Sequence, residues 1–293
     1  MDKSAGHNKE AAEHLGAIYN RMINSSFRAE IYEFILERLL QGAEFKYPEK
    51  PAVSIIIPVK NEFILTCALL NSIKKNTNGI EYEIITADDN SEDETTDIEN
   101  IFKNVKRIVN NTGHEGYVSN VNNAAAYARG EYLLMLHNDV ILTPFYLEAL
   151  LNTLQNNKEI GIAGSKTLNI DETVLSCGFA QHTDGGFEPL GFDEPENYME
   201  DKDYIECSLC SSASMLFKRS VWEKAGGFNA DFAPAFYETA DFAFNLKYNY
   251  GLKTVCAPKS KVFHFEEISY HNNDLNEKLK EEHKALFLKK WGS

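Results

Sequence analysis

The run AVSIIIPV, residues 52–59, decides the fold class of this chain. It is almost continuously apolar and rich in β-branched residues, which is typical of a strand buried on both faces of a parallel sheet. Similar runs follow as YEIITADD (82–89), VKRIVN (105–110), EYLLMLHND (131–139) and IGIAGSKTL (160–168). Helix-forming segments separate them, at residues 62–76, 92–103, 117–129 and 144–157. This alternation predicts an α/β fold with a mostly parallel, Rossmann-like central sheet flanked by helices.

The regular alternation ends after residue 170. Residues 176–206 are rich in glycine, acids and aromatics and are interpreted as loops and short antiparallel strands. The rest of the chain predicts a strand and a short helix within 212–228, a helix at 240–251, an edge strand at 252–265 and a terminal amphipathic helix at 271–291. Near the other end, residues 29–41 place apolar side chains on one helical face.

Composition limits the possible partners. The chain has 293 residues, of which 43% are hydrophobic, and a net charge of −15. Such acidity argues against nucleic acid or anionic lipid as the main partner and suits a protein that binds a divalent cation. The first residues are polar and no apolar run reaches the roughly 18 residues of a membrane span. We therefore expect no signal peptide. The expected location is the cytoplasm, either free or at the inner face of the membrane.

Five cysteines form no regular framework, and Cys207-x-x-Cys210 is a lone pair of the zinc or redox type. Without a second pair at useful spacing, we interpret these two as small, half-buried residues of a strand.

Polar residues follow the predicted strands where each one ends. Ligands of parallel α/β sheets bind in the crevice beyond these carboxyl ends. The residues concerned are Pro58, Asn61, Glu62, Asp88, Asp89, Ser91, His137, Asn138 and Asp139. Each acid has a structural alternative: Asp89 as a helix cap, Asp139 as a turn residue. The sequence lacks G-x-G-x-x-G after its first strand and lacks a P-loop, which argues against a dinucleotide fold and excludes a P-loop NTPase.

Over about residues 51–268 the chain resembles glycosyltransferase family 2, whose members have the GT-A fold. The matching text is VSIIIPVKNE, ADDNSEDET, GYVSNVNNAAAYARGEYLLMLHNDVILTP, SMLFKRSVWEKAGGF, FYETADFAFNLKYNYG and VFHFEE. The resemblance implies a GT-A domain at 49–270 with a nucleotide-binding half (51–140) and a smaller, partly antiparallel acceptor-binding half (141–270). Helical extensions would occupy residues 1–48 and 271–293.

The resemblance also assigns a nucleotide site and a metal site. Nucleotide-binding residues would be Pro58, Val59, Asn61, Glu62, Asp88, Asp89, His137 and Asn138, with Asp89 accepting the N3–H of uracil or thymine. His137-Asn138-Asp139 occupies the D-x-D position, so Asp139 would bind Mn²⁺ or Mg²⁺ and His264 would complete the metal shell. A histidine ligand shifts the preference toward Mn²⁺.

The segment Glu238-Thr239-Ala240-Asp241 matches the region that supplies the catalytic base of the family. Thr239 stands where the family usually has its catalytic aspartate, and threonine is no base near neutral pH. We hypothesise that Glu238 takes this role, with Asp241 as the second candidate; Asp241 is equally suited to bind an acceptor hydroxyl or to cap its helix. Two further residues depart from the family pattern. His137 stands in place of an acidic residue, and Lys60 stands in place of an aromatic residue.

The expected function is a metal-dependent, inverting transfer of a sugar from a nucleotide-diphosphate donor, UDP- or dTDP-linked, to a saccharide or lipid-linked saccharide. Surface polysaccharide synthesis is the role that the family implies. The alternatives are a weak or inactive protein that binds nucleotide or glycan, and, less well supported, a nucleotidyltransferase. The apolar faces of the helices at 29–41 and 274–290 predict a homodimer or a neighbouring domain. Smaller features are His114 near the donor and Asn122, interpreted as structural.

Overall fold

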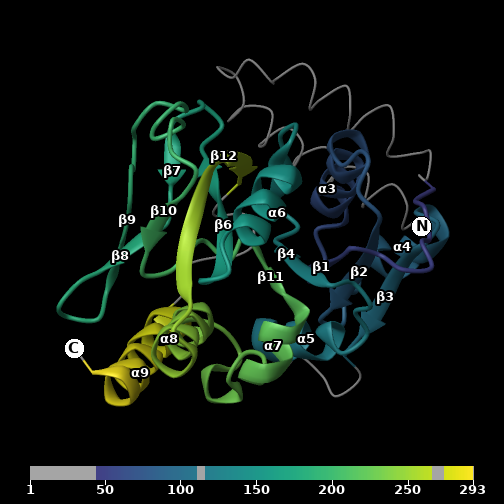
Figure 1. Cartoon of the computed structure of the whole chain (residues 1–293). Coiled ribbons are helices and arrows are strands. Elements are labelled where there is room, and N and C mark those ends of the chain that lie inside the picture. Colours follow the sequence, from purple (N-terminus) through teal and green to yellow (C-terminus); the bar gives the residue numbers. More distant parts are fainter. Residues whose placement is uncertain (1–43, 111–115, 266–273, 293) are drawn as a thin grey trace.

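The computed structural model describes residues 44–110, 116–265 and 274–292. The first half of its central sheet consists of β1 (Val53–Val59), β2 (Tyr82–Asp88), β3 (Val105–Val109) and β4 (Tyr132–Leu136). These strands pair in parallel in the order β3-β2-β1-β4 (Figure 1). Val59 is opposite Asp88, so the carboxyl ends of β1 and β2 meet at one edge of the sheet.

The second half of the sheet mixes strand directions. Its longer strands are β6 (Ile160–Leu168), β11 (Ser214–Lys218) and β12 (Lys253–His264). β11 runs antiparallel between β4 and β6, whereas β6 and β12 are parallel. Three short strands add antiparallel pairs: β5 (Val140–Leu142) and β10 (Ile205–Cys207) to β12, and β7 (Val174–Ser176) to β6. A separate hairpin consists of β8 (Phe179–Gln181) and β9 (Phe187–Pro189). This is the mixed α/β architecture that the sequence predicted.

The prediction of an edge strand at residues 252–265 is wrong. β12 lies inside the sheet, with β6 on one side and β10 and β5 on the other. Its lysines suit an interior strand because acids of β10 and of the segment before β10 pair with them. The ion pairs are Lys253–Glu206 at 2.9 Å, Lys259–Asp203 at 2.9 Å and Lys261–Glu196 at 2.7 Å.

Helices cover both faces of the sheet and enclose two apolar cores (Figure 1). One face is covered by α3 (Phe63–Asn76) and α6 (Tyr146–Asn156), and the other by α5 (Gly116–Ala125), α7 (Arg219–Ala225) and α8 (Glu238–Tyr250). The predicted helix at 92–103 is shorter than expected and divides into η1 (Glu94–Asp97) and α4 (Ile98–Ile101). A further short helix, η2 (Ala230–Phe232), precedes α8.

The predicted C-terminal helix is present as α9 (Asp274–Trp291). Phe287 on α9 is fully buried and contacts the rings of Phe187, Tyr237 and Phe244, so part of its apolar face packs on its own chain. The predicted helix at 29–41 lies outside the described residues. Among those described, no helix combines the length and the apolar character that crossing a membrane requires.

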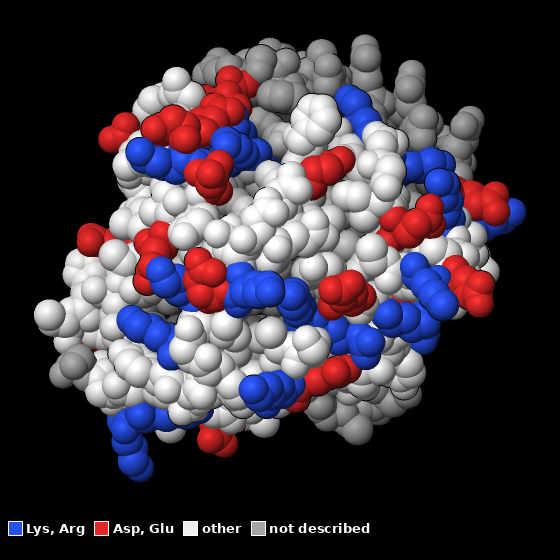
Figure 2. Space-filling view, viewed as in Figure 1, with Lys and Arg blue, Asp and Glu red and all other residues white. Residues whose placement is uncertain are grey.

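The cysteines carry free thiols. Cys207 ends β10 and is half-buried, whereas Cys210 lies beyond the strand and is fully buried. Acidic and basic side chains are interspersed over the face of the molecule that Figure 2 shows. The negative net charge is therefore not gathered into one acidic patch on this face.

Candidate active site and metal centre

Asp139 and His264 lie side by side because of strand pairing. Asp139 directly precedes β5, and β5 pairs with the end of β12 so that Val140 is opposite His264. The backbone N–H of Phe265 also donates to the carbonyl oxygen of Asp139 at 3.0 Å. As a result, Nε2 of His264 lies 3.3 Å from Oδ1 of Asp139, and the side chains are only 8% and 6% exposed.

His137 completes a cluster of three possible metal ligands. It directly follows β4, and its backbone N–H donates to Ala213 at 3.0 Å. Its Nδ1 lies 4.0 Å from Oδ1 of Asp139, and its ring meets the ring of His264 edge to face at 5.6 Å. One donor atom from each of His137, Asp139 and His264 lies within 4.8 Å of the others, so one ion could contact all three.

The protonation states suit a cation. Burial lowers the pKa of His137 to about 4, so its imidazole is neutral at pH 7. Burial alone raises the pKa of Asp139, but the hydrogen bond and charge of His264, together with the charge of His137, outweigh it and leave the pKa lowered. A carboxylate and a neutral imidazole, the forms of Asp139 and His137 at pH 7, are the forms that bind metal. The donor set therefore fits a divalent ion.

At the ends of β1 and β2, Asn61 holds the loop of the predicted nucleotide site. Its backbone N–H donates to Oγ of Ser91 at 2.7 Å, and its Oδ1 accepts from the N–H of Glu92 at 2.7 Å. Asn61 and Glu62 have φ values of 57° and 56°. This left-handed pair turns the chain sharply into α3. Asp93 fixes the loop from the other side, because it accepts from the N–H of Phe63 at 2.9 Å.

The two acids at the end of β2, Asp88 and Asp89, have different surroundings. Asp88 is fully buried; it accepts from Nε of Arg107 at 2.7 Å and from the N–H and hydroxyl of Ser91 at 2.8 and 2.6 Å. Both carboxylate oxygens of Asp88 thus accept hydrogen bonds from the protein, and these bonds hold the loop that follows β2. Asp89 is half-buried, and Lys60 donates to its carbonyl oxygen at 3.0 Å.

The remaining predicted nucleotide residues differ in exposure. Pro58 is half-buried at the same sheet edge, whereas Val59 belongs to the apolar core. Asn138 is buried and donates to Oγ1 of Thr66 on α3 at 3.3 Å. His114 lies outside the described residues.

A chain of contacts connects the metal-ligand cluster with the segment that precedes α8. The ring of Tyr117, at the start of α5, lies 5.6 Å from the ring of His137 and 5.8 Å from that of Phe228. Asn122 makes two hydrogen bonds with the backbone of Phe228. Its Nδ2 donates to the Phe228 carbonyl at 2.8 Å, and its Oδ1 accepts from the Phe228 N–H at 2.9 Å. This agrees with the structural interpretation of Asn122. Val118 of α5 donates to the carbonyl of Pro234 at 3.1 Å.

Glu238 begins α8 directly after an unusual turn. Phe236 and Tyr237 both have positive φ, 74° and 65°, where aromatic residues are rare. The side chain of Glu238 is buried, and burial raises its pKa. Oε1 accepts from Oγ1 of Thr239 at 3.1 Å, whereas Oε2 has no hydrogen-bond partner among the described residues. A buried carboxyl with a raised pKa and one uncommitted oxygen is a candidate for a general base.

Asp241, the second candidate base, faces α9. Lys290 lies 2.7 Å from its Oδ1, and the indole N–H of Trp291 donates to the same oxygen at 2.7 Å. Only 4% of the Asp241 side chain is exposed. The structure thus brings together His137, Asp139 and His264, and it binds Asp241 to the C-terminal helix.

Sequence reasoning missed Tyr117, Arg107 and Asp93. Asp93 could have been recognised from the sequence, because an acid directly before a helix commonly caps it. Here Asp93 precedes η1 and accepts a hydrogen bond from the backbone N–H of Thr95. The roles of Tyr117 and Arg107 depend on contacts between distant segments and left no local signal.

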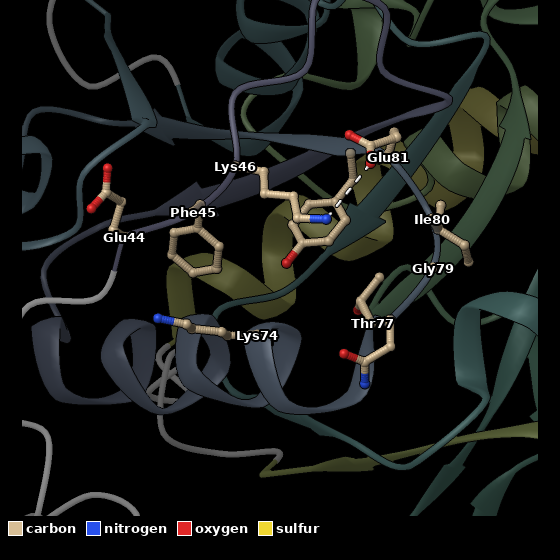
Figure 3. A pocket seen from close by; sticks show the side chains of 10 residues that line it. Glu44, Phe45, Lys46, Lys74, Thr77, Gly79, Ile80 and Glu81 are labelled. Atoms are coloured by element: carbon tan, nitrogen blue, oxygen red, sulfur yellow. Dashed lines mark ion pairs between the residues drawn. The ribbon is translucent and has the colours of Figure 1, made fainter.

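A pocket of about 250 Å³ lies at the opposite edge of the sheet, around the start of β2. Figure 3 shows Lys46 extended toward Glu81, with Phe45 and Thr77 beside them. Lys46 and Glu81 are largely exposed and 3.8 Å apart, so their attraction is weak. This pocket is remote from the metal-ligand cluster.

The chain belongs to glycosyl transferase family 2, whose profile matches residues 54–225, more than half of the sequence. It is 28% identical over 238 residues to the O-antigen biosynthesis protein RfbC of Myxococcus xanthus, an alignment that covers 76% of this chain and 18% of RfbC. It is 29% identical over 188 residues to the GalNAc(5)-diNAcBac-PP-undecaprenol beta-1,3-glucosyltransferase of Campylobacter jejuni, covering 62% of this chain and 56% of that enzyme. The chain thus spans only part of these relatives.

The fold is similar to that of GalNAc-T7, solved with UDP, GalNAc and Mn²⁺, with a TM-score of 0.63 at 16% identity. The match covers 76% of this chain and 45% of GalNAc-T7. At this identity the similarity concerns the fold alone, and the chain has the GT-A architecture that the sequence predicted.

Proposed function

We propose that this protein transfers a sugar from a nucleotide-diphosphate donor to a hydroxyl group of a saccharide or lipid-linked saccharide. The observation that carries the proposal is the cluster of His137, Asp139 and His264 at the sheet edge where parallel α/β proteins bind ligands, in a chain of glycosyl transferase family 2. Asp89 directly follows β2 and is half-buried. We assign to it the acceptance of a hydrogen bond from the N3–H of a uracil or thymine base.

A divalent cation fits the donor set of His137, Asp139 and His264. Two imidazoles and one carboxylate favour Mn²⁺ over Mg²⁺, because Mg²⁺ prefers oxygen ligands. When bound, the cation supplies Lewis-acid stabilisation to the negative charge of the departing diphosphate. The pairing of β5 with β12 fixes the positions of Asp139 and His264 relative to each other. These two proposed ligands are therefore already in place before a cation binds.

Glu238 is the proposed general base. Its carboxylate takes the proton of the acceptor hydroxyl while that oxygen forms a bond to the anomeric carbon and the bond from this carbon to the diphosphate breaks. Attack from the face opposite the leaving group inverts the configuration. The raised pKa of Glu238 brings its basicity closer to that of the hydroxyl it serves.

The biological role that we infer is the synthesis of a surface polysaccharide. It rests on the names of the partly aligned relatives, an O-antigen biosynthesis protein and a glucosyltransferase that acts on an undecaprenol-linked saccharide. A lipid-linked acceptor would be met at the cytoplasmic face of a membrane. The homodimer predicted through the terminal helices remains a proposal.

The test is to incubate the purified chain with a panel of UDP- and dTDP-sugars, Mn²⁺ and saccharide acceptors, and to measure the release of nucleoside diphosphate. Release that requires metal and disappears in Asp139→Ala supports the transferase. Thr239, in place of the usual catalytic aspartate, favours one alternative, a nucleotide- or glycan-binding module. Nucleotide binding without turnover, with every acceptor tried, would establish that alternative.

A further inference from the structure

We propose that helix α9 is part of the catalytic apparatus and that His283 is a positioning residue for Glu238. This inference rests on the proposed role of Glu238 as general base. α9 lies outside the residues that the family profile matches, as does Glu238 itself. Its contacts nevertheless reach the acceptor-side turn from which α8 begins.

His283 binds the backbone of this turn. The side chain is buried, and its Nδ1 lies 2.9 Å from the carbonyl oxygen of Ala235 and 3.1 Å from that of Phe236. Carbonyl oxygens only accept hydrogen bonds, so Nδ1 must carry the hydrogen and donate to both. The ring is held edge to face against Phe232 at 5.5 Å. His283 is therefore fixed in both orientation and tautomer.

The turn needs such support. Phe236 and Tyr237 both adopt the left-handed conformation, which side chains with a Cβ atom rarely adopt. Conformations of this kind persist where the surroundings hold them. Besides His283, the hydroxyl of Tyr237 donates to the carbonyl of Gly185 at 3.3 Å, and the ammonium group of Lys280 lies 5.2 Å from the ring of Phe236. Two of these three contacts come from α9.

α9 also binds α8 at a residue that follows Glu238 in the chain. Lys290 and Trp291 both bind Oδ1 of Asp241, at 2.7 Å each, one turn after Glu238. The fully buried Phe287 fills the space between these contacts and His283 along the helix. The backbone that carries Glu238 is therefore held by α9 both before and after the proposed base.

Loss of the His283 donor leaves the carbonyl oxygens of Ala235 and Phe236 without this hydrogen bond and frees the turn to relax. The carboxylate of Glu238 then moves relative to the acceptor hydroxyl. The metal-ligand cluster depends on β4, β5 and β12 and is left intact. A defect in turnover with normal nucleotide binding is the specific signature of this role.

The experiment compares two variants of the full chain. His283→Phe keeps the ring and removes the donor, whereas His283→Asn places an amide N–H near the position of Nδ1. Glu282→Gln, an exposed neighbour on the same helix, is the control. The measurements are kcat, acceptor KM, the Kd of UDP with Mn²⁺, and hydrogen exchange of the backbone amides of residues 235–241.

We expect His283→Phe to lower kcat by about 100-fold, the loss that a misplaced reacting group produces. The Kd of UDP should stay unchanged, and exchange at residues 235–241 should become faster. His283→Asn should recover kcat to within about tenfold of the parent, because one hydrogen bond is worth roughly that factor. An unchanged kcat in His283→Phe, or an equal loss in both variants, would overturn the proposal.

The hydrogen exchange separates this inference from the proposed function. If the parent protein turns over no nucleotide sugar, the transferase proposal fails, and exchange alone decides the role of His283. Unchanged protection of residues 235–241 in His283→Phe then overturns the positioning role. If Glu238→Gln retains transfer, the base assignment fails independently of the exchange result.

Discussion

Nε2 of His264 lies 3.3 Å from Oδ1 of Asp139, although Asp139 follows the fourth strand and His264 ends the twelfth. The antiparallel pairing of β5 with β12 makes these two residues neighbours. The geometry of the proposed metal site therefore depends on the pairing of β5 with β12, and substitution of either residue tests it.

Asp139→Asn and His264→Gln should each weaken Mn²⁺ binding by at least about 100-fold, since even supporting residues of metal sites contribute up to that factor. An exposed histidine, His182, provides the control as His182→Gln. Isothermal titration with Mn²⁺ measures the effect. Equal Mn²⁺ affinity in His264→Gln and the parent would remove His264 from the metal shell.

In the proposed metal site, His137 is the ligand that we expect to favour Mn²⁺ over Mg²⁺. His137→Asp converts the segment to D-x-D and replaces an imidazole with an oxygen donor, which suits Mg²⁺. We expect the ratio of activity with Mn²⁺ to activity with Mg²⁺ to fall by about tenfold relative to the parent, because oxygen ligands remove much of the selectivity for Mn²⁺. His137→Asn, with a neutral oxygen, should lie between them. A ratio that is the same in all three proteins would place His137 outside the metal shell.

Much of the fold could be predicted from local sequence. The strands β1, β2, β4 and β6 stand out because a strand buried on both faces is continuously apolar, and the polar residues that follow them are equally visible. His264 and Asp139 could be paired only through the family resemblance, since no local pattern shows that β5 turns back onto β12.

Other features depend on distant parts of the chain. The interior position of β12 was missed because its lysines are neutralised by acids such as Glu206 and Asp203, which lie in another segment. The contacts of Asp241 could not be foreseen either, because Lys290 and Trp291, which bind it, come from the last turn of α9. Tyr117 lies beside His137 only after α5 has packed on the sheet.

Glu238→Gln should abolish transfer and change the pH dependence of stability. The ordinary pKa of glutamate is 4.5, and burial raises the pKa of Glu238 in the folded protein above it. Below pH 4.5 both states bind the proton, so the substitution has little effect. As the pH rises from 4.5 toward the raised folded-state pKa, the unfolded state loses its proton first, which destabilises the parent but not the variant.

Thermal unfolding between pH 4 and pH 8 measures this difference. The melting temperature of Glu238→Gln relative to the parent should increase with pH across this window. A difference that is constant with pH would mean that Glu238 ionises equally easily in the folded and unfolded states. The acid limb of the pH–rate profile of the parent should likewise lie above pH 4.5.

Arg107→Met should destabilise the fold and weaken nucleotide binding together. It leaves the carboxylate of Asp88, which is fully buried, without its counter-ion, and removal of one partner of a buried pair costs about 3–5 kcal/mol. Arg129→Met is a matched control, because Arg129 pairs at 2.7 Å with the nearly buried Glu83 near the opposite edge of the sheet. Urea unfolding should show a loss of stability in both variants, whereas the Kd of UDP should rise only in Arg107→Met. An equal rise in both would show that the effect on nucleotide binding is not local.

Gly116, at the start of α5, lies directly against Pro234, which precedes α8. A Cβ atom at residue 116 would lie 2.7 Å from the carbonyl oxygen of Pro234, and the φ of Gly116 is +76°. Gly79 has nearly the same φ, +77°, but no atom within 4 Å of its Cβ position. Gly79→Ala therefore measures the backbone strain alone, about 1–2 kcal/mol, and Gly116→Ala measures strain plus the clash.

The clash must be relieved by moving α5 away from Pro234. That movement shifts Tyr117 from His137 on one side and the turn before Glu238 on the other. We expect Gly116→Ala to lower the melting temperature more than Gly79→Ala and to lower kcat at least tenfold, a loss of about 1.4 kcal/mol in the transition state, with Gly79→Ala retaining the kcat of the parent. Calorimetry and steady-state kinetics provide both numbers. Equal kcat in the two variants would mean that the contact between α5 and Pro234 supports the fold without contributing to the alignment of the site.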